Sequence, residues 1–514
     1  MLAVTHWGRS LMNIKNSRSP STVLWGYSRR DLCGVRTFFV KDNFLVSFCQ
    51  ELLDPAGNHR YNHYIAGNRN ILKLDDRGIF QTLFPEGRSH ELHRALLEGT
   101  QCMYCGFDPT ADSLHVGHLL TIMALLHCQR GGHSVIALIG GATAKIGDPS
   151  GRSTERAAMN EDTILHNVSG IHRTLDDIFM NHEEIFWQQE KTALGNRKIL
   201  NNADWYNKIN LIDFLSSTGR HFRMGTMLGR QSVTTRLSKP EGMSFTEFCY
   251  QIFQAYDWLH LHNTEGCRIQ VGGNDQTGNI VSGHELISRV QDVPVWGLTV
   301  PLITSTTGDK LGKTAGNAVW LNPSKTPPFE LYQYFIRMPD SDMKKYLNLF
   351  TFFNDKVLSD ILTKHNNKPE NRYAQKKLAE EVTKLVHGKA GLLSAERCTE
   401  ALFNGSAEKL AMLSDDELND LFRNTPVTEL YLDPGTTVFD VVMKAKCFSR
   451  AVDAERVIKA GGVYINHQRA EEGDYVLIPG QHILPNGITL IRIGKKNYYL
   501  VKWLETGTLG NTRR

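Results

Sequence analysis

Two strongly apolar segments, CMYCGF (102–107) and SVIALIGG (134–141), flank a helix-length segment of the chain. Leucine, isoleucine and methionine recur throughout residues 117–130, and Gly131 and Gly132 then end the predicted helix. Short apolar runs bounded by turns predict buried strands. Because a strand, a crossover helix and a second strand form a right-handed parallel unit, we predict an α/β protein with a parallel sheet.

A second unit of this kind follows, with a strand predicted at 267–273 and a helix at 278–290. Helical segments are predicted between the two units, at 210–222 and 244–262. Ligands bind outside the carboxyl ends of strands in open parallel sheets, so the segments after these strands should surround one crevice. These segments are FDPTADSLHVGH (107–118), GGATAKIGDPSGR (140–152) and GGNDQTGN (272–279).

The chain changes character after PSKTPP (323–328). It is helical and charged through about residue 422, with AQKKLAEEVTKLVHG (374–388) the clearest helix. TPVTELYLDPGTT (425–437) is typical of a linker, and residues 438–477 predict two helices, a Gly-Gly turn and a short hairpin. A chain of 514 residues is too long for one core, which agrees with several domains.

Charge and cysteine content restrict the class of protein. The net charge of +4 does not demand a polyanionic partner, but residues 440–514 contain 12 Lys or Arg against 7 Asp or Glu. No run of about 18 apolar residues occurs, so no membrane span is predicted. Nine scattered cysteines are typical of a reducing compartment. Cys102 and Cys105 lack the second pair that a structural zinc site needs, and a redox pair stays open.

The first 41 residues contain seven Lys or Arg, several serines and one acid, Asp31. This composition predicts a mitochondrial transit peptide, and the alternative is a basic arm that contacts nucleic acid. Residues 42–78 have no clear period and predict a loosely ordered extension.

His115 and His118 lie three residues apart at the start of the first predicted helix. Zinc-binding helices of the H-E-x-x-H type use a different spacing and an intervening acid, so the pair favours a structural role or a phosphate site. Gly117 permits close approach of a ligand, and a helix N-terminus attracts an anion. TTGDKLGKT (306–314), which alone would indicate a solvated loop, supplies two lysines suited to a triphosphate.

HVGH (115–118) and KLGKT (310–314) resemble the two signatures of class I aminoacyl-tRNA synthetases. Across residues 78–505 the motifs follow the order found in tyrosyl-tRNA synthetases of the bacterial and mitochondrial type, including SFTEFCYQIFQAYD and LAEEVTKLVHG. The resemblance implies activation of L-tyrosine by ATP and transfer of tyrosine to the 3′ end of tRNA(Tyr). It also implies a homodimer and ATP-borne Mg²⁺ without a dedicated protein metal site. With the basic N-terminus, it implies mitochondrial tRNA and the mitochondrial matrix.

The same resemblance implies a domain order. A transit peptide at 1–41 and the extension at 42–78 would precede a Rossmann-like catalytic domain at 79–328, with a dimer-forming insertion at about 200–245. An α-helical anticodon-binding domain at 329–424, a linker at 425–436 and a small α+β RNA-binding domain at 437–514, similar to a ribosomal protein, would follow.

By resemblance, residues can be assigned to each part of the reaction. Because a carboxylate is already nucleophilic, catalysis should come mainly from positioning and charge stabilisation. The triphosphate would be held by Thr110, His115, His118, Lys310, Lys313 and Thr314. Tyrosine would be bound by Tyr104 and Asp257 at the phenol, by Asp148, Tyr250 and Gln254 at the ammonium, and by Gln270. The nucleotide site would comprise Cys105, Gly106, Asp108, Gly117, Gly273, Asp275 and Gln276. RNA would contact Arg450, Arg456 and Lys459, which otherwise belong to a solvated basic helix.

Two positions depart from the family pattern: Asn274 stands where serine is usual, and Thr277 where tryptophan or leucine is usual. A tryptophanyl-tRNA synthetase shares both signatures, but Tyr104 and Asp257 argue against it, unless Asp257 is a surface acid. An RNA-binding or splicing protein without the chemistry should have lost signature residues, whereas both histidines and both lysines are present. A dual role stays open.

Overall fold

The computed structural model describes residues 69–152, 154–187, 193–303, 313–314, 317–403, 406–423, 425–495 and 497–504. The side chains of Lys313, Thr314 and Asn317 are outside this description. The transit peptide predicted at 1–41, most of the extension predicted at 42–78, and Lys310 lie outside the described residues. Over the described part of the chain, no helix has the length and apolar character needed to cross a membrane.

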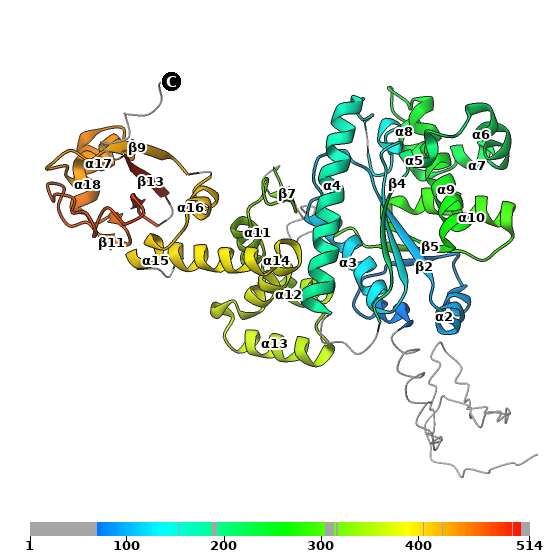
Figure 1. The fold of residues 1–514 in the computed structure, drawn as a ribbon, viewed down its shortest axis with the longest axis horizontal. Helices are drawn as coiled ribbons and strands as arrows, with labels where there is room; N and C mark the ends of the chain where they lie inside the picture. The colour runs from blue at the N-terminus through cyan, green and yellow to red at the C-terminus, as the bar shows by residue number, and fades with distance from the viewer. Residues whose placement is uncertain are drawn as a thin grey trace, which may run out of the picture. The chain divides into compact units, whose positions relative to one another are not determined.

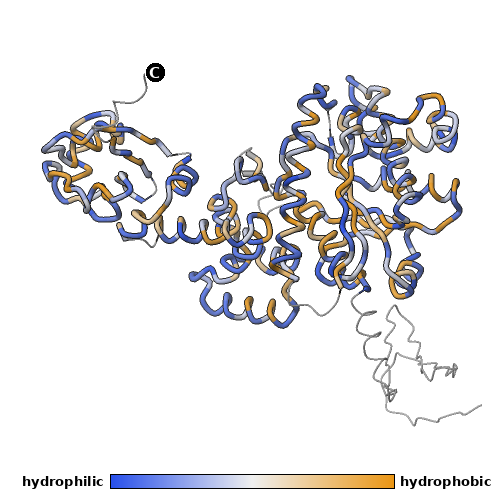
Figure 2. Tube along the Cα trace, viewed as in Figure 1, coloured by the Kyte–Doolittle hydropathy of each residue, from blue (hydrophilic) through white to orange (hydrophobic). Residues whose placement is uncertain are grey.

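A six-stranded sheet organises the part of the chain that contains both predicted units. The strand order is β1-β6-β5-β2-β3-β4, and every neighbouring pair is parallel except β1 with β6. The strands are β1 (Thr82–Phe84), β2 (Cys102–Phe107), β3 (Ser134–Ile139), β4 (Arg197–Asn201), β5 (Cys267–Gly273) and β6 (Trp296–Val300). The predicted Rossmann-like α/β fold is confirmed, and Figure 2 shows its apolar residues concentrated along the central strands.

Helices cover both faces of this sheet, with α3 and α4 on one side and α9 and α10 on the other (Figure 1). The helices around the sheet are α2 (Ser89–Glu98), α3 (Val116–Arg130), α4 (Glu161–Asn181), α9 (Phe245–Glu265) and α10 (Thr277–Gln291). Successive side chains of β2 alternate between the two cores. Cys102 and Cys105, three residues apart on β2, therefore point to opposite faces, which excludes the redox pair.

The predicted insertion consists of short helices between β4 and α9. They are α5 (Ala203–Tyr206), α6 (Leu211–Ser217), α7 (Met224–Leu228) and α8 (Gln231–Leu237). The helix predicted at 210–222 is shorter, because a 3-10 turn at Gly219–His221 follows α6. Arg236 and Glu247 form a buried ion pair at 2.7 Å that fastens α8 to the first turn of α9.

The described end of the predicted N-terminal extension packs against the core. A 3-10 helix, η1 (Ile71–Asp75), buries Ile71. The Arg77 guanidinium donates to the carbonyls of Asn348, Thr351 and Phe353 at 3.0, 2.7 and 2.7 Å. The prediction of a loose extension is therefore wrong for residues 69–78. The prediction failed because this segment is held by one buried isoleucine and by an arginine whose partners are distant in the sequence, and neither produces a local hydrophobic pattern.

The predicted helical region is built from α11 (Pro328–Ile336), α12 (Met343–Phe350), α13 (Asp355–Asn367), α14 (Tyr373–Phe403), α15 (Ala407–Ala411) and α16 (Asp415–Leu421). The long helix α14 is kinked at Gly388, whose φ of 70° is outside the helical range. α11 and α14 pack closely against each other, and α12 contacts α3, so this region continues the hydrophobic core of the sheet.

The last part of the chain forms a second, five-stranded sheet of order β11-β10-β12-β13-β9. Its elements are β9 (Val427–Tyr431), α17 (Val438–Lys444), α18 (Ala451–Lys459), β10 (Val463–Ile465), β11 (Gln468–Arg469), β12 (Ile488–Ile493) and β13 (Asn497–Leu504). The predicted helices and hairpin are confirmed. The predicted linker at 425–436 is wrong where β9 pairs with β13, because an edge strand with alternately exposed residues shows no apolar run.

Candidate active site

A cavity of about 590 Å³ lies at the carboxyl ends of β2, β5 and β6, where a parallel sheet is expected to bind ligands. The structure brings together all of the predicted reaction-site residues whose side chains it describes. Those lining the cavity are Tyr104, Cys105, Gly106, Asp108, Thr110, His115, Gly117, His118, Asp148, Tyr250, Gln254, Asp257, Gln270, Gly273, Asp275 and Gln276. Lys313 and Thr314 form strand β7 (Lys313–Thr314), but the roles of these two residues and of Lys310 stay predictions.

The two histidines cap α3 and at the same time face the cavity. The Gly117 N–H donates to His115 Nδ1 at 3.0 Å, and the His115 N–H donates to His118 Nδ1 at 3.2 Å. Because each Nδ1 accepts a backbone hydrogen, each neutral ring carries its proton on Nε2. Burial, followed by the neighbouring His115, lowers the pKa of His118 to about 3. The pair thus combines the structural role and the phosphate role that the sequence left open: it presents neutral N–H donors beside a helix N-terminus.

Asp257 lies at the buried end of the cavity and has a fixed set of donors. The Asn202 Nδ2 group donates to one carboxylate oxygen at 3.0 Å, and the Trp205 indole donates to the other at 2.9 Å. Burial raises the pKa of Asp257 to about 7, and these hydrogen bonds oppose that rise. The neighbouring Tyr104 hydroxyl is buried and has no hydrogen-bond partner among the described residues. A ligand hydroxyl would satisfy both groups, so Asp257 is not a surface acid.

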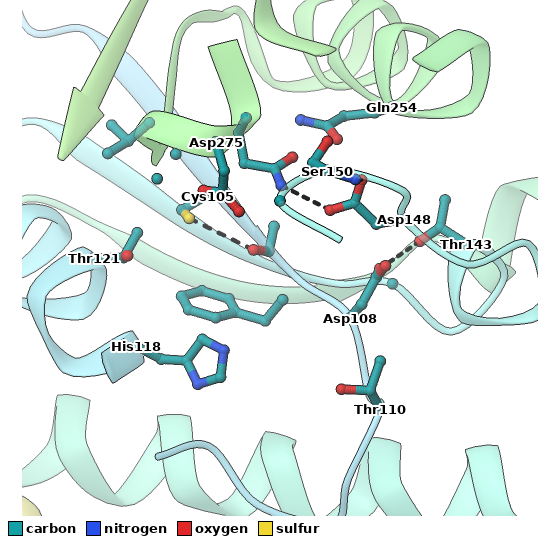
Figure 3. Close-up of a pocket in the computed structure, with 18 of the residues that line it drawn as sticks. Cys105, Asp108, Thr110, His118, Thr121, Thr143, Asp148, Ser150, Gln254 and Asp275 are labelled. Atoms are coloured by element: carbon teal, nitrogen blue, oxygen red, sulfur yellow. Dashed lines mark hydrogen bonds between the residues drawn. The ribbon is translucent and has the colours of Figure 1, made fainter. Parts of the chain in front are cut away.

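Asp108 joins the predicted nucleotide and ammonium sites. Its carboxylate accepts from the Thr143 hydroxyl at 2.8 Å (Figure 3) and from the Tyr250 hydroxyl at 2.8 Å. Burial and the nearby Asp148 raise the pKa of Asp108 to about 6. A Cβ at Gly140 would displace the Asp108 carboxylate and the Thr143 hydroxyl, so glycine after β3 preserves their hydrogen bond. The structure thus pairs Tyr250, predicted for the ammonium, with Asp108, predicted for the nucleotide.

Asp148 is held by three donors beside the same cavity. The Gln276 amide donates to it at 2.7 Å, the Ser150 N–H at 3.0 Å and the Asn279 amide at 3.4 Å. Figure 3 shows Asp148 and Ser150 in the same part of the site as Gln254. Asp148 therefore presents a fixed carboxylate to the cavity, and this carboxylate can attract a cationic group of a ligand.

The two unusual residues of the far wall contact each other rather than the cavity. The Thr277 hydroxyl donates to the Asn274 carbonyl at 2.7 Å, across the 3-10 turn η5 (Asn274–Gln276) that precedes α10. Neither residue lines the cavity. The Thr277 departure therefore adds a side-chain hydrogen bond to the turn that presents Asp275 and Gln276, whereas Asn274 contributes only its main-chain carbonyl.

Four of the site side chains that sequence reasoning missed either orient Asp257 or bring positive charge to the cavity. Asn202 and Trp205 orient Asp257 from the segment after β4, and nothing in their local sequence indicates this contact. Arg152 and Arg156 line the cavity, and the Arg156 guanidinium donates to the Asp148 carbonyl at 3.5 Å. Arg152 ends the quoted segment GGATAKIGDPSGR, so its position next to a Gly-rich turn could have indicated an anion site.

Comparisons with known proteins show the family to which the chain belongs. Residues 98–404 match the family model of class I tRNA synthetases (W and Y), and residues 417–501 match the tyrosine–tRNA ligase SYY-like C-terminal domain. The mitochondrial tyrosine–tRNA ligase of Drosophila melanogaster is 52% identical over 447 residues, which cover 86% of this chain and 96% of that protein. The Homo sapiens mitochondrial tyrosine–tRNA ligase is 52% identical over 434 residues, covering 84% of this chain and 91% of that protein. The chain belongs to the tyrosyl-tRNA synthetase family.

A solved structure extends the family likeness. The C-terminally truncated mitochondrial tyrosyl-tRNA synthetase of Aspergillus nidulans is 33% identical, with a TM-score of 0.59 over 67% of this chain and 100% of that chain. Tyrosine–tRNA ligase 1 of Bacillus subtilis is 40% identical over 437 residues, which cover 84% of this chain and 99% of that protein. These bacterial and mitochondrial relatives confirm the predicted type. The tryptophanyl alternative is excluded by this membership.

The predicted RNA-binding residues lie far along the chain from the cavity, in and beside α18. Arg450 and Arg456 both form ion pairs with Asp453, at 2.8 and 3.0 Å, while their side chains remain 77% and 74% exposed. Lys459 ends the same helix. The exposed cations could reach a polyanion, but each arginine must share Asp453, and their RNA contacts stay predictions.

Proposed function

We propose that this chain activates L-tyrosine with ATP and transfers tyrosine to the 3′ end of tRNA(Tyr) in mitochondrial translation. The observation that carries the proposal is that one cavity is lined both by Tyr104 and Asp257 and by His115 and His118. The tyrosine–tRNA ligase relatives, which match over most of their length, support the same activity.

Selection of tyrosine would take place at the buried end of the cavity. The substrate phenol would donate to the Asp257 carboxylate and accept from the Tyr104 hydroxyl. Phenylalanine would leave both groups unpaired, and an unsatisfied buried polar group costs about 1–3 kcal/mol. The substrate ammonium would lie near Asp148, Tyr250 and Gln254, with Gln270 assisting.

The first reaction step needs little proton transfer. The tyrosine carboxylate attacks the α-phosphorus of ATP, a new P–O bond forms, and the bond to the bridging oxygen breaks to release pyrophosphate. Charge grows on the departing phosphates, where the Nε2–H groups of His115 and His118 and the α3 N-terminus can stabilise it. Thr110 and the KLGKT residues Lys310, Lys313 and Thr314 would complete this end, and the nucleotide would lie against Cys105, Gly106, Asp108, Gly117, Gly273, Asp275 and Gln276. Mg²⁺ would arrive with ATP.

We also propose that the chain works as a homodimer through its insertion. Large apolar side chains are exposed there, with Ile212 68% and Leu215 49% exposed on α6. Others in the same part of the chain are Leu211, Met224, Leu228, Leu237 and Phe245. Large exposed apolar patches on soluble proteins mark interaction surfaces, among them subunit interfaces. The double substitution of Ile212→Asp and Leu215→Asp should convert a dimer to a monomer in sedimentation velocity, while an unchanged dimer would place the interface elsewhere.

The rest of the chain would serve delivery and tRNA recognition. Residues 1–41 would direct the protein to the mitochondrial matrix, residues 329–424 would bind the anticodon, and residues 437–514 would bind RNA through Arg450, Arg456 and Lys459. The mitochondrial relatives and the match of residues 417–501 to the family C-terminal domain support these assignments.

Charging of a mitochondrial tRNA(Tyr) transcript with labelled tyrosine or phenylalanine tests the proposal. We expect charging with tyrosine and at least roughly 100-fold less with phenylalanine, because two buried groups lose their partners. Asp257→Ala should reduce this selectivity and leave the KM for ATP within about threefold. A chain that charges both amino acids equally, or neither, would refute the function.

A further inference from the structure

The segment that follows KLGKT returns to the start of α3 and pairs with it. After β8 (Asn317–Ala318), the Val319 carbonyl accepts from the Val116 N–H at 2.9 Å. The Leu321 N–H donates to the Leu114 carbonyl at 2.8 Å. Residues 319–321 and the HVGH segment, about 200 residues apart in the sequence, are thus joined by backbone hydrogen bonds on both sides of His115.

Trp320 lies opposite His115 in this pairing and contacts its ring. The centroids of the Trp320 and His115 rings are 6.2 Å apart at an interplanar angle of 58°. The His115 ring also stacks on the His118 ring, with centroids 4.0 Å apart at an interplanar angle of 27°. The His115 imidazole therefore has an aromatic neighbour from α3 and another from the segment after KLGKT, which limits its tilt.

Trp320 is itself held in place. The backbone N–H of Trp320 donates to the Thr326 hydroxyl at 2.9 Å. The Lys325 Nζ lies 4.8 Å from the centre of the Trp320 ring and forms an ion pair with Asp112, in the segment before His115. A cation–π contact and an ion pair thus connect the indole to the same FDPTADSLHVGH segment that carries the histidines.

We propose that Trp320 is a positioning residue for adenylate formation, which acts by holding the His115 imidazole in register with His118. The inference rests on the proposed function, because it assigns to His115 a role at the triphosphate. Without the indole, the His115 ring keeps its contacts with the Gly117 N–H and His118 but loses the aromatic contact from the other segment, so the position of its Nε2–H is less closely fixed. A misplacement of about 1 Å at a reacting centre can cost about 100-fold in rate.

A double-mutant cycle tests whether Trp320 acts through His115. The proteins are the full chain, Trp320→Ala, His115→Asn and the double variant, each measured by tyrosine-dependent ATP–pyrophosphate exchange. We expect Trp320→Ala to lower kcat by roughly 10- to 100-fold, with the KM for tyrosine unchanged within about twofold. In the His115→Asn background, Trp320→Ala should lower kcat by less than about threefold, because the imidazole that Trp320 positions is already absent.

Two further variants separate positioning from folding. Trp320→Phe keeps an aromatic ring and should recover most of the kcat. Trp187→Ala makes the same change at a tryptophan whose ring contacts Arg130, a residue that does not line the cavity. The exchange kinetics of this control should stay close to those of the wild-type protein. The thermal midpoint of each variant shows whether a lost kcat reflects unfolding.

Independent, multiplicative losses across the cycle would overturn the proposal, as would full kcat in a folded Trp320→Ala protein. If Trp320→Ala is unfolded, Trp320→Leu, which keeps apolar bulk without an aromatic ring, takes its place in the cycle with His115→Asn, and the same two outcomes decide the question. An unchanged chain that shows no tyrosine-dependent exchange would instead refute the proposed function, and the two failures are therefore distinguishable.

Discussion

Substitution of Asp257 by asparagine should remove a pH dependence of tyrosine binding. Burial raises the pKa of this carboxyl to about 7, in spite of the donors Asn202 and Trp205. A bound phenol donates to the ionised carboxylate, so the ionised form binds tyrosine better. Below pH 7 the carboxyl is protonated and must release its proton on binding, whereas above pH 7 it is already ionised.

The magnitude follows from the pKa. Each pH unit below 7 weakens tyrosine binding by about tenfold, or about 1.4 kcal/mol, so the Kd at pH 6 should exceed that at pH 8 by roughly tenfold. Asp257→Asn has no such proton to lose, and its Kd should vary by less than about twofold over the same range. The variant should bind more weakly at pH 8 by about 1–3 kcal/mol, because an amide suits neither its two donors nor the phenol.

Calorimetric titration of the ATP-free protein with tyrosine measures both quantities. In buffers of different ionisation enthalpy, the wild-type chain should release about one proton per tyrosine at pH 6 and almost none at pH 8. Asp108, with its pKa raised to about 6, is present in both proteins, so the comparison isolates Asp257. A wild-type Kd that is constant from pH 6 to pH 8, or an equal pH dependence in the variant, would refute the reasoning.

Three other predictions concern separate parts of the chain. Arg77→Ala should lower the free energy of unfolding by about 3 kcal/mol in a urea titration, because three carbonyls lose a charged donor; an unchanged midpoint would contradict this. Asp453→Asn should strengthen RNA binding by releasing two arginines, whereas Arg456→Ala should weaken it and reduce the salt slope by about one, as measured by filter binding. Asn202→Ala should raise the pKa of Asp257 and move the tyrosine-binding transition to higher pH, and an unmoved transition would remove Asn202 from this role.

The parts of the fold that sequence could predict are those with a local pattern. The strands β2, β3 and β5 are apolar runs because both faces of a parallel sheet are covered, and the polar segments after them therefore met at one cavity. β9 and η1 escaped prediction because their partners, β13 and the α12 region, are distant and only alternate or single residues are buried.

The candidate site shows the same limit. Its residues could be assigned by resemblance because each lies in a contiguous motif, and the structure places them around one cavity. The protonation and orientation that the surroundings impose on these side chains could not be predicted from the sequence. The Nδ1-accepting caps fix the histidine tautomer, and Asn202 and Trp205 reach Asp257 from another segment, so both effects arise only from tertiary contacts.

Amino-acid-dependent ATP–pyrophosphate exchange tests the central claim most directly, because it reports adenylate formation without tRNA. The account predicts exchange with tyrosine, at least roughly 100-fold slower exchange with phenylalanine, and a large loss of exchange on His118→Asn with tyrosine binding retained. Equal exchange with the two amino acids, or no exchange with tyrosine in the folded full-length chain, would contradict it.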